Sequence, residues 1–242
     1  MTTRSEQVRT ADGDFAAHVA IPDSGGGPGI LLLQEIFGVN DYIRDAARRL
    51  AELGYVALAP DLFWRIEPGI ELGAGDEDLE RGMAAARRLD FAAAVQDAIA
   101  ALAALRGLPE VAGGAGSGGG GRAGALGFCL GGTLAFQVAA HGDPDVAVCY
   151  YGSGIAGAVD AADTISCPVL LHFGGSDPHI PREQVDAVAA MAAGRDGFEL
   201  HVHDDAGHAF DNGFSPRFSD PAAAAVAWEQ TSAFLARELP AQ

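Results

Sequence analysis

A glycine-rich turn at residues 127–132, with the sequence Gly-Phe-Cys-Leu-Gly-Gly, constrains the fold of this 242-residue chain most strongly. The turn ends an apolar run, residues 123–128, that is typical of a buried strand, and it precedes a helix-like segment at residues 133–140. A sharp turn from strand to helix strains the residue at its tip, so the neighbouring side chains must be small. The sequence therefore predicts that Cys129 stands at the tip of such a turn. The alternative is a tight turn with a packed thiol, because free cysteines are often buried.

Strand-like and helix-like segments alternate along nearly the whole chain. Buried parallel strands are predicted at residues 30–33, 55–59, 123–128, 146–151, 168–173 and 198–202, and a hairpin at residues 8–21. Helices are predicted between most of them, at residues 41–53, 76–89, 91–105, 133–140, 181–193 and 221–239. This alternation predicts one α/β domain over residues 1–242, with a mostly parallel central sheet and helices on both faces.

Composition and charge restrict the class of protein. The hydrophobic fraction of 49% is ample for a sizeable core, and the formal net charge of −18 disfavours nucleic-acid or anionic-membrane partners. Three cysteines are too few for a disulfide framework, which indicates a reducing compartment. We find no apolar signal core or membrane-length apolar run and expect a cytoplasmic protein. We also expect a small-molecule substrate, no cofactor, and a monomer or weak homodimer.

Three reactive side chains follow three different predicted strands. Cys129 ends the strand at 123–128, while Asp177 and His208 follow later strands. The order nucleophile, acid, histidine is that of the α/β-hydrolase fold. We predict that Cys129 attacks a carbonyl as a thiolate, that His208 transfers protons, and that Asp177 orients the imidazole.

Two further features are expected at the same edge of the sheet. Glu35 stands at the carboxyl end of the predicted strand 30–33, where open α/β sheets place their ligands, although alone it is more typical of a loop carboxylate. The backbone N–H groups of Leu130 and Ile36 are predicted to form an oxyanion hole.

Taken together, these motifs resemble the dienelactone hydrolase family (carboxymethylenebutenolidases) of α/β hydrolases. The resemblance covers almost the whole chain and rests on Gln-Glu-Ile-Phe-Gly-Val-Asn at 34–40, Ala-Pro-Asp-Leu-Phe at 59–63, the turn at 127–132, Tyr-Tyr-Gly at 150–152 and Gly-His-Ala-Phe at 207–210. It implies hydrolysis of an enol-lactone, from dienelactone to maleylacetate, through a cysteine acyl-enzyme. It also implies that Glu35 is displaced by substrate and deprotonates Cys129, and that Tyr151 contacts the substrate.

The arginines with which the family holds a substrate carboxylate match this sequence poorly. Arg81 stands in about the right region, whereas Asn212 stands where an arginine is expected after the histidine. We retain both as candidate substrate-binding residues. Phe37, Trp64 and Phe210 are candidates for the pocket wall, although aromatic residues are more often simply core.

Three other interpretations remain open. A broader hydrolase of small esters, lactones or thioesters would use the same residues. A non-catalytic redox sensor would need an exposed, low-pKa thiol at Cys129 but neither acid nor histidine. A metal site at His201, His203, Asp205 and His208 is a weaker alternative, because no closed tetrahedral spacing is visible.

The glycine- and alanine-rich run at residues 111–124 is unusual in length. Such a run buries too little side chain to offset its ordering entropy, so we predict a flexible surface loop. A phosphate-binding role is disfavoured, because the Gly-x-x-x-x-Gly-Lys-Ser/Thr pattern is absent.

Overall fold

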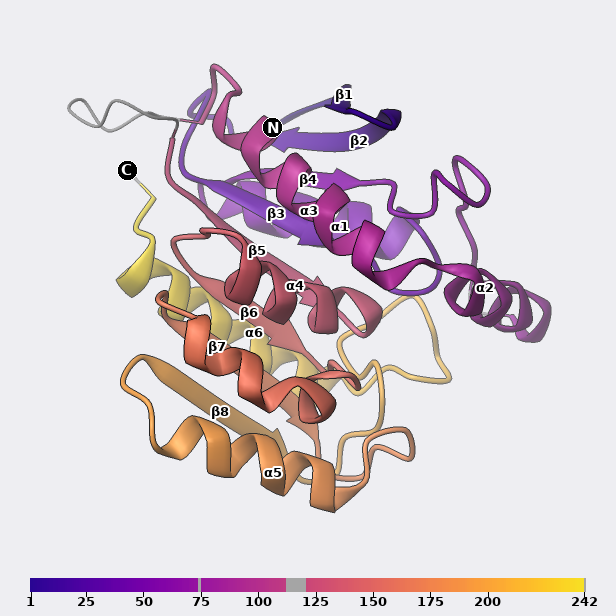
Figure 1. Cartoon of the computed structure of the whole chain (residues 1–242), viewed down its shortest axis with the longest axis vertical. Helices are drawn as coiled ribbons and strands as arrows, with labels where there is room; N and C mark the ends of the chain where they lie inside the picture. The colour runs from indigo at the N-terminus through magenta and orange to yellow at the C-terminus, as the bar shows by residue number, and fades with distance from the viewer. Residues whose placement is uncertain (74, 112–120, 242) are drawn as a thin grey trace.

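The computed structural model describes residues 1–73, 75–111 and 121–241 (Figure 1). Its elements, in chain order, are β1 (Thr2–Thr10), β2 (Gly13–Ile21), β3 (Gly29–Leu33), α1 (Asp41–Glu52), β4 (Val56–Pro60), α2 (Asp76–Arg88), α3 (Phe91–Arg106), β5 (Ala123–Phe128), α4 (Leu130–His141), β6 (Ala147–Tyr150), the 3₁₀ helix η1 (Ile155–Thr164), β7 (Val169–Gly174), α5 (Arg182–Ala193), β8 (Phe198–His203) and α6 (Pro221–Glu238). None of the helices in these residues is long and apolar enough to cross a membrane.

The strands form one eight-stranded sheet in the order β1-β2-β4-β3-β5-β6-β7-β8. The β1–β2 and β2–β4 pairs are antiparallel, and the other pairs are parallel. Helices α3, α4 and α5 cover one face, and α1 and α6 cover the other (Figure 1). The central strands are buried on both faces, which explains their continuous apolar runs. The predicted mostly parallel α/β architecture is confirmed.

The turn at Cys129 is as sharp as its glycines predict. Cys129 has φ 54° and ψ −113°, outside the regions that most residues occupy, and α4 begins immediately after it. A Cβ atom on Gly127 would stand 1.9 Å from the Gly131 carbonyl oxygen, and one on Gly131 would stand 2.1 Å from that of Leu33. Glycine is therefore required on both sides of the tip. The helix starts three residues earlier than predicted, so its N-terminus lies directly beside the thiol.

One local prediction needs correction. The glycine-rich loop was predicted to extend to residue 124, but residues 123 and 124 belong to β5, which spans residues 123–128 as predicted. A Cβ atom on Gly124 would lie 2.5 Å from a Val146 methyl carbon, so this glycine serves close packing between strands. Residues 112–120 of that predicted loop lie outside the described residues. In α6 the buried residues are Ala227, Thr231, Phe234 and Leu235, whereas Ala225 is exposed.

Candidate active site

The fold brings Cys129, Asp177 and His208 together at the carboxyl edge of the sheet. The Nδ1 atom of His208 lies 2.7 Å from Asp177 Oδ2, and its Nε2 atom lies 3.1 Å from Cys129 Sγ. The backbone N–H of His179 donates to the other oxygen of Asp177 at 2.7 Å. The carboxylate is therefore held in place, and the imidazole bridges it to the sulfur. This is the arrangement that the order of the residues predicted.

The groups around His208 favour its protonated form. Burial lowers the pKa of His208, but its hydrogen bonds to Asp177 and Cys129 outweigh burial and raise the pKa to about 10. A protonated imidazole donates from both nitrogens, so the sulfur becomes the acceptor. The N-terminus of α4 adds partial positive charge at the same sulfur.

Glu35 lies two residues beyond β3 and is only 1% exposed. Its Oε2 atom accepts a hydrogen bond from the Asn212 amide at 2.8 Å, whereas its Oε1 atom is buried without a partner among the described residues. Burial raises its pKa from 4.5 to about 7, although Asn212 and His208 act in the opposite direction. Glu35 therefore exchanges a proton close to neutral pH.

Asn212 has a different place from the predicted one. Its amide donates to Glu35, and its Oδ1 atom accepts from the backbone N–H of Phe214 at 3.1 Å. It does not line the cavity beside Cys129. We correct the assignment of Asn212 as a substrate-binding residue, because its hydrogen-bonding groups serve Glu35 and the local turn.

A cavity of about 580 Å³ opens beside the cysteine. Six of the predicted site residues line it, namely Glu35, Ile36, Phe37, Cys129, Leu130 and His208. Ile36 and Leu130 thus border the same cavity as Cys129, as residues of an oxyanion hole must. The sequence reasoning missed several other lining residues, among them Thr133, Ser153, Gly154, His179, Ala209, Leu79, Met83, Ala86, Phe91, Arg217 and Phe218.

One wall of this cavity is apolar and comes from α2 and the start of α3. Leu79, Met83 and Ala86 lie at intervals of four and three residues, so they share one helix face. Arg217 also lines the cavity, and its Nη1 atom lies 2.8 Å from Asp76 Oδ1 at the beginning of α2. Arg217 follows His208 by nine residues, so a wider search for the expected arginine would have found it.

Arg81 lies away from the cavity, which corrects its predicted role. Arg81 lies two positions after Leu79 in α2, which corresponds to a rotation of about 200° around the helix axis. Its side chain is 60% exposed and lies 3.6 Å from Glu67. The side chain therefore points away from the face that lines the cavity.

The other three aromatic candidates also do not line this cavity, so their assignments as substrate-binding residues are corrected. Tyr151 is fully buried, with its ring centroid 5.3 Å from that of His208, and Phe210 packs on Tyr151 at 5.2 Å. Trp64 stacks on Phe15, and its indole N–H donates to Asp97 at 2.8 Å. Tyr151 thus packs beside His208 and is itself packed by Phe210, whereas Trp64 belongs to the packing near β2.

The histidines of β8 contact another histidine. The ring of His201 stacks on His172 at 5.6 Å, and His203 Nε2 lies 3.2 Å from His172 Nδ1. Within residues 1–73, 75–111 and 121–241, three or more His, Cys, Asp or Glu side chains are nowhere grouped so as to hold a metal ion. His208, the third histidine of the alternative metal site, contacts Cys129 instead.

Comparison with known proteins places this geometry in context. The sequence profile of the dienelactone hydrolase family matches residues 15–239. A carboxymethylenebutenolidase from Pseudomonas sp. strain P51 is 35% identical over 228 residues, covering 94% of this chain and 92% of its own. One from Pseudomonas putida is 34% identical over 238 residues, covering 98% and 97%. The crystal structure of a dienelactone hydrolase-like promiscuous phosphotriesterase from metagenomic libraries superposes with a TM-score of 0.78 at 25% identity, covering 98% of both chains.

Proposed function

The chain belongs to the dienelactone hydrolase family, and on this basis we propose that it opens an enol-lactone through a Cys129 acyl-enzyme. Family membership makes it a hydrolase of carboxylic ester bonds. The substrate and the covalent mechanism are our proposal. The observation that carries it is the continuous contact from Asp177 through His208 to the sulfur of Cys129, at 2.7 and 3.1 Å.

The acylation step follows from this contact. The thiolate of Cys129 attacks the lactone carbonyl, and the resulting oxyanion accepts hydrogen bonds from the N–H groups of Leu130 and Ile36. When the tetrahedral intermediate collapses, the ring C–O bond breaks, and the imidazolium of His208 donates its proton to the enolate oxygen that leaves. The enol, still attached through the new thioester, tautomerises to a ketone.

Deacylation uses the same groups in reverse. Neutral His208 takes a proton from water, the hydroxide attacks the thioester carbonyl, and the C–S bond breaks to release the keto acid. We assign Glu35 as the acceptor of the thiol proton when the substrate enters. Its pKa of about 7 suits a group that changes protonation near neutral pH, as does its Oε1 atom, which has no hydrogen-bond partner within the part of the chain that the structure describes.

We assign the binding of a substrate carboxylate to Arg217 in place of Arg81 and Asn212. Arg217 lines the cavity, and its guanidinium pairs with Asp76, which a substrate carboxylate would replace. The apolar wall formed by α2 favours a second activity, the hydrolysis of neutral esters or lactones, because that wall offers burial and no charge.

The test is steady-state hydrolysis of cis-dienelactone and of p-nitrophenyl acetate by the wild type and by Cys129→Ala. We expect Cys129→Ala to fold and to lose turnover of both. Mass spectrometry after quenching should find an acyl adduct on Cys129 in the wild type. Cys167→Ala is the matched control, since Cys167 is a half-buried thiol whose pKa is raised, mainly by burial, to about 11.

The outcomes separate the candidates. Cys129-dependent turnover of both substrates with a preference for dienelactone supports the proposal. Cys129-dependent cleavage of the acetate alone supports the mechanism and moves the substrate to neutral esters. Turnover that survives in Cys129→Ala contradicts the mechanism. The absence of both turnover and adduct would favour the redox-sensor alternative.

A further inference from the structure

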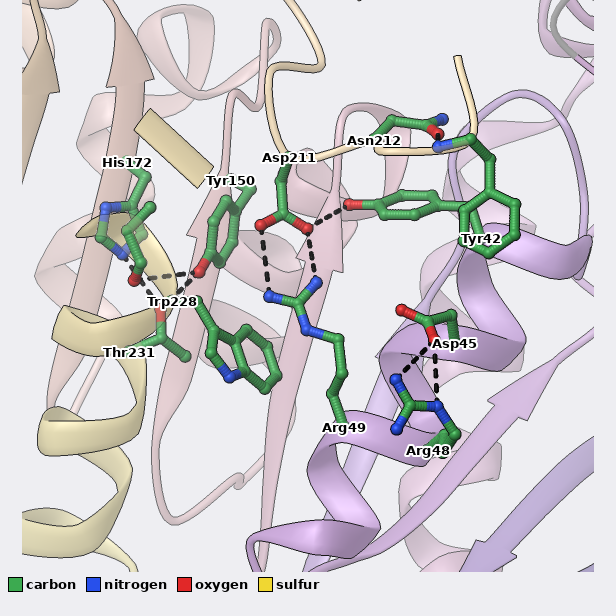
Figure 2. A network of polar contacts seen from close by, with 12 residues as sticks. Tyr42, Asp45, Arg48, Arg49, Tyr150, His172, Asp211, Asn212, Trp228 and Thr231 are labelled. Carbon is green, nitrogen blue, oxygen red and sulfur yellow. Dashed lines mark hydrogen bonds and ion pairs between the residues drawn. The ribbon is translucent and has the colours of Figure 1, made fainter. Parts of the chain in front are cut away.

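A largely buried ion pair between Arg49 and Asp211 lies beside α1 and α6 (Figure 2). The guanidinium of Arg49 contacts both oxygens of Asp211, Nη1 to Oδ2 at 3.1 Å and Nη2 to Oδ1 at 3.5 Å. The Asp211 side chain has no exposed surface, and the hydroxyl of Tyr42 donates to Oδ2 at 2.8 Å. The guanidinium also packs over the ring of Trp228 at 3.7 Å. The pair thus joins α1, α6 and the loop after β8.

Two routes lead from this pair to the reacting groups. Asp211 is followed directly by Asn212, whose amide donates to Glu35, and His208 lies three residues earlier on the same loop. The hydroxyl of Tyr42 also lies 3.2 Å from the hydroxyl of Tyr151, whose ring packs against His208. A movement of Asp211 would therefore be passed to Asn212, which bonds Glu35, and to Tyr151, which packs against His208.

Stability alone does not account for a buried pair of this kind. Desolvating two charges costs several kcal/mol per ion, and well-packed apolar replacements are often neutral or stabilising. Arg49 fixes the orientation of the Asp211 carboxylate, because a planar guanidinium binds a carboxylate in one orientation. We propose that the Arg49–Asp211 ion pair positions the loop from His208 to Asn212, so that Asn212 holds Glu35 and His208 stands between Asp177 and Cys129. The inference rests on the proposed function, because it assumes that Glu35 and His208 act on the thiol.

Positioning and simple charge predict opposite changes at Glu35. The groups that act on its carboxyl are Asn212, His208, Asp211 and Tyr151. The charge of Asp211 raises the pKa of Glu35, whereas the hydrogen bond from Asn212 lowers it. If only the charge matters, removing Asp211 lowers the pKa of Glu35. If the pair positions Asn212, removing it weakens that hydrogen bond and the pKa of Glu35 rises.

The experiment compares two double variants, each of which replaces one of two adjacent arginines on α1 together with the aspartate that pairs with it. Arg49→Met with Asp211→Leu removes the buried pair without leaving a charge unpaired. The control is Arg48→Met with Asp45→Leu, which removes an ion pair of 2.7 Å between more exposed side chains (Figure 2). Each protein is assayed for kcat and KM with p-nitrophenyl acetate, for the pH dependence of Cys129 alkylation by iodoacetamide, and for urea stability.

We expect the buried double variant to fold and to lose about tenfold to hundredfold in kcat, because displacing catalytic groups by even ~1 Å has effects of this size. Its KM should change by less than about twofold. We also expect the transition near pH 7 that depends on Glu35 to move to higher pH. The control should match the wild type. Should the buried double variant not fold, Tyr42→Phe carries the test, since it removes one hydrogen bond to Asp211 and leaves both charges. A smaller loss in kcat with the same direction of shift is then expected.

Wild-type kcat and pH dependence in the folded buried variant would overturn the inference, as would a transition that moves to lower pH. The inference and the proposed function fail in different ways. If Cys129→Ala and Glu35→Gln retain activity, the proposed function is wrong. If both lose activity and the buried variant behaves like its control, only the positioning role is wrong.

Discussion

Glu35 should destabilise the folded protein as the pH rises, and Glu35→Gln should remove that cost. Burial raises its pKa from 4.5 to about 7, so between these values the folded state holds a proton that the unfolded chain has lost. The free energy of unfolding therefore decreases with rising pH across this interval. Below pH 4.5 the carboxyl is neutral in both states and costs nothing. Above pH 7 the full cost applies, roughly 3 kcal/mol at 1.36 kcal/mol for each unit of pKa change.

Glutamine at this position keeps the shape of the site and cannot ionise. Its carbonyl oxygen can still accept the hydrogen bond that Asn212 donates to Glu35. We expect Glu35→Gln to be more stable than the wild type by roughly 3 kcal/mol at pH 8, with the difference shrinking toward zero near pH 4.5. The variant should at the same time lose hydrolytic activity, because a neutral amide cannot accept the thiol proton.

Urea unfolding of both proteins under reducing conditions, at several pH values from 4.5 to 8, measures this difference. Glu52→Gln is the control, since the Glu52 side chain is 59% exposed and pairs with Arg48 on the surface. Its stability difference from the wild type should be small throughout. A stability difference for Glu35→Gln that does not change with pH would refute the reasoning, because it would mean that the buried carboxyl does not titrate in this range.

Three further predictions concern the cavity and the turn. Arg217→Ala should raise KM for dienelactone about tenfold or more and leave KM for p-nitrophenyl acetate nearly unchanged, since only dienelactone carries a carboxylate. An equal change in KM for the two substrates would exclude the assigned role. Met83→Ser should lower kcat/KM for p-nitrophenyl hexanoate by about threefold to tenfold more than for p-nitrophenyl acetate, because the change removes part of the apolar wall. A dependence of kcat/KM on acyl-chain length like that of the wild type would contradict this prediction. Gly131→Ala should destabilise the protein by about 1–3 kcal/mol in urea unfolding, because its Cβ would meet the Leu33 carbonyl oxygen. The control is Gly157→Ala, which has open space around it and should differ little from the wild type. Equal stability of the two variants would argue against the tight turn.

The sequence by itself predicted the order and type of the strands and of the α-helices, and it pointed to three candidate catalytic residues. Periodicity and capping residues are local properties, so β5, α1 and α5 begin and end within a few residues of the predicted bounds. Parallel strands bring their carboxyl ends to one edge of a sheet, so Cys129, Asp177 and His208 were expected to meet there. Glycines that flank a single cysteine also predict a sharp turn, because the turn depends only on neighbouring residues.

Only the tertiary structure decided which side chains line the cavity and which groups support it. The direction of a side chain depends on the face that its element turns to its neighbours, and this is why Arg81 points away from the site while Arg217, after β8, lines it. The roles of Asn212 and of the Arg49–Asp211 pair depend on contacts between residues more than 150 positions apart in the chain. Such contacts leave no periodic pattern in the sequence, because they arise only when separate elements pack against one another.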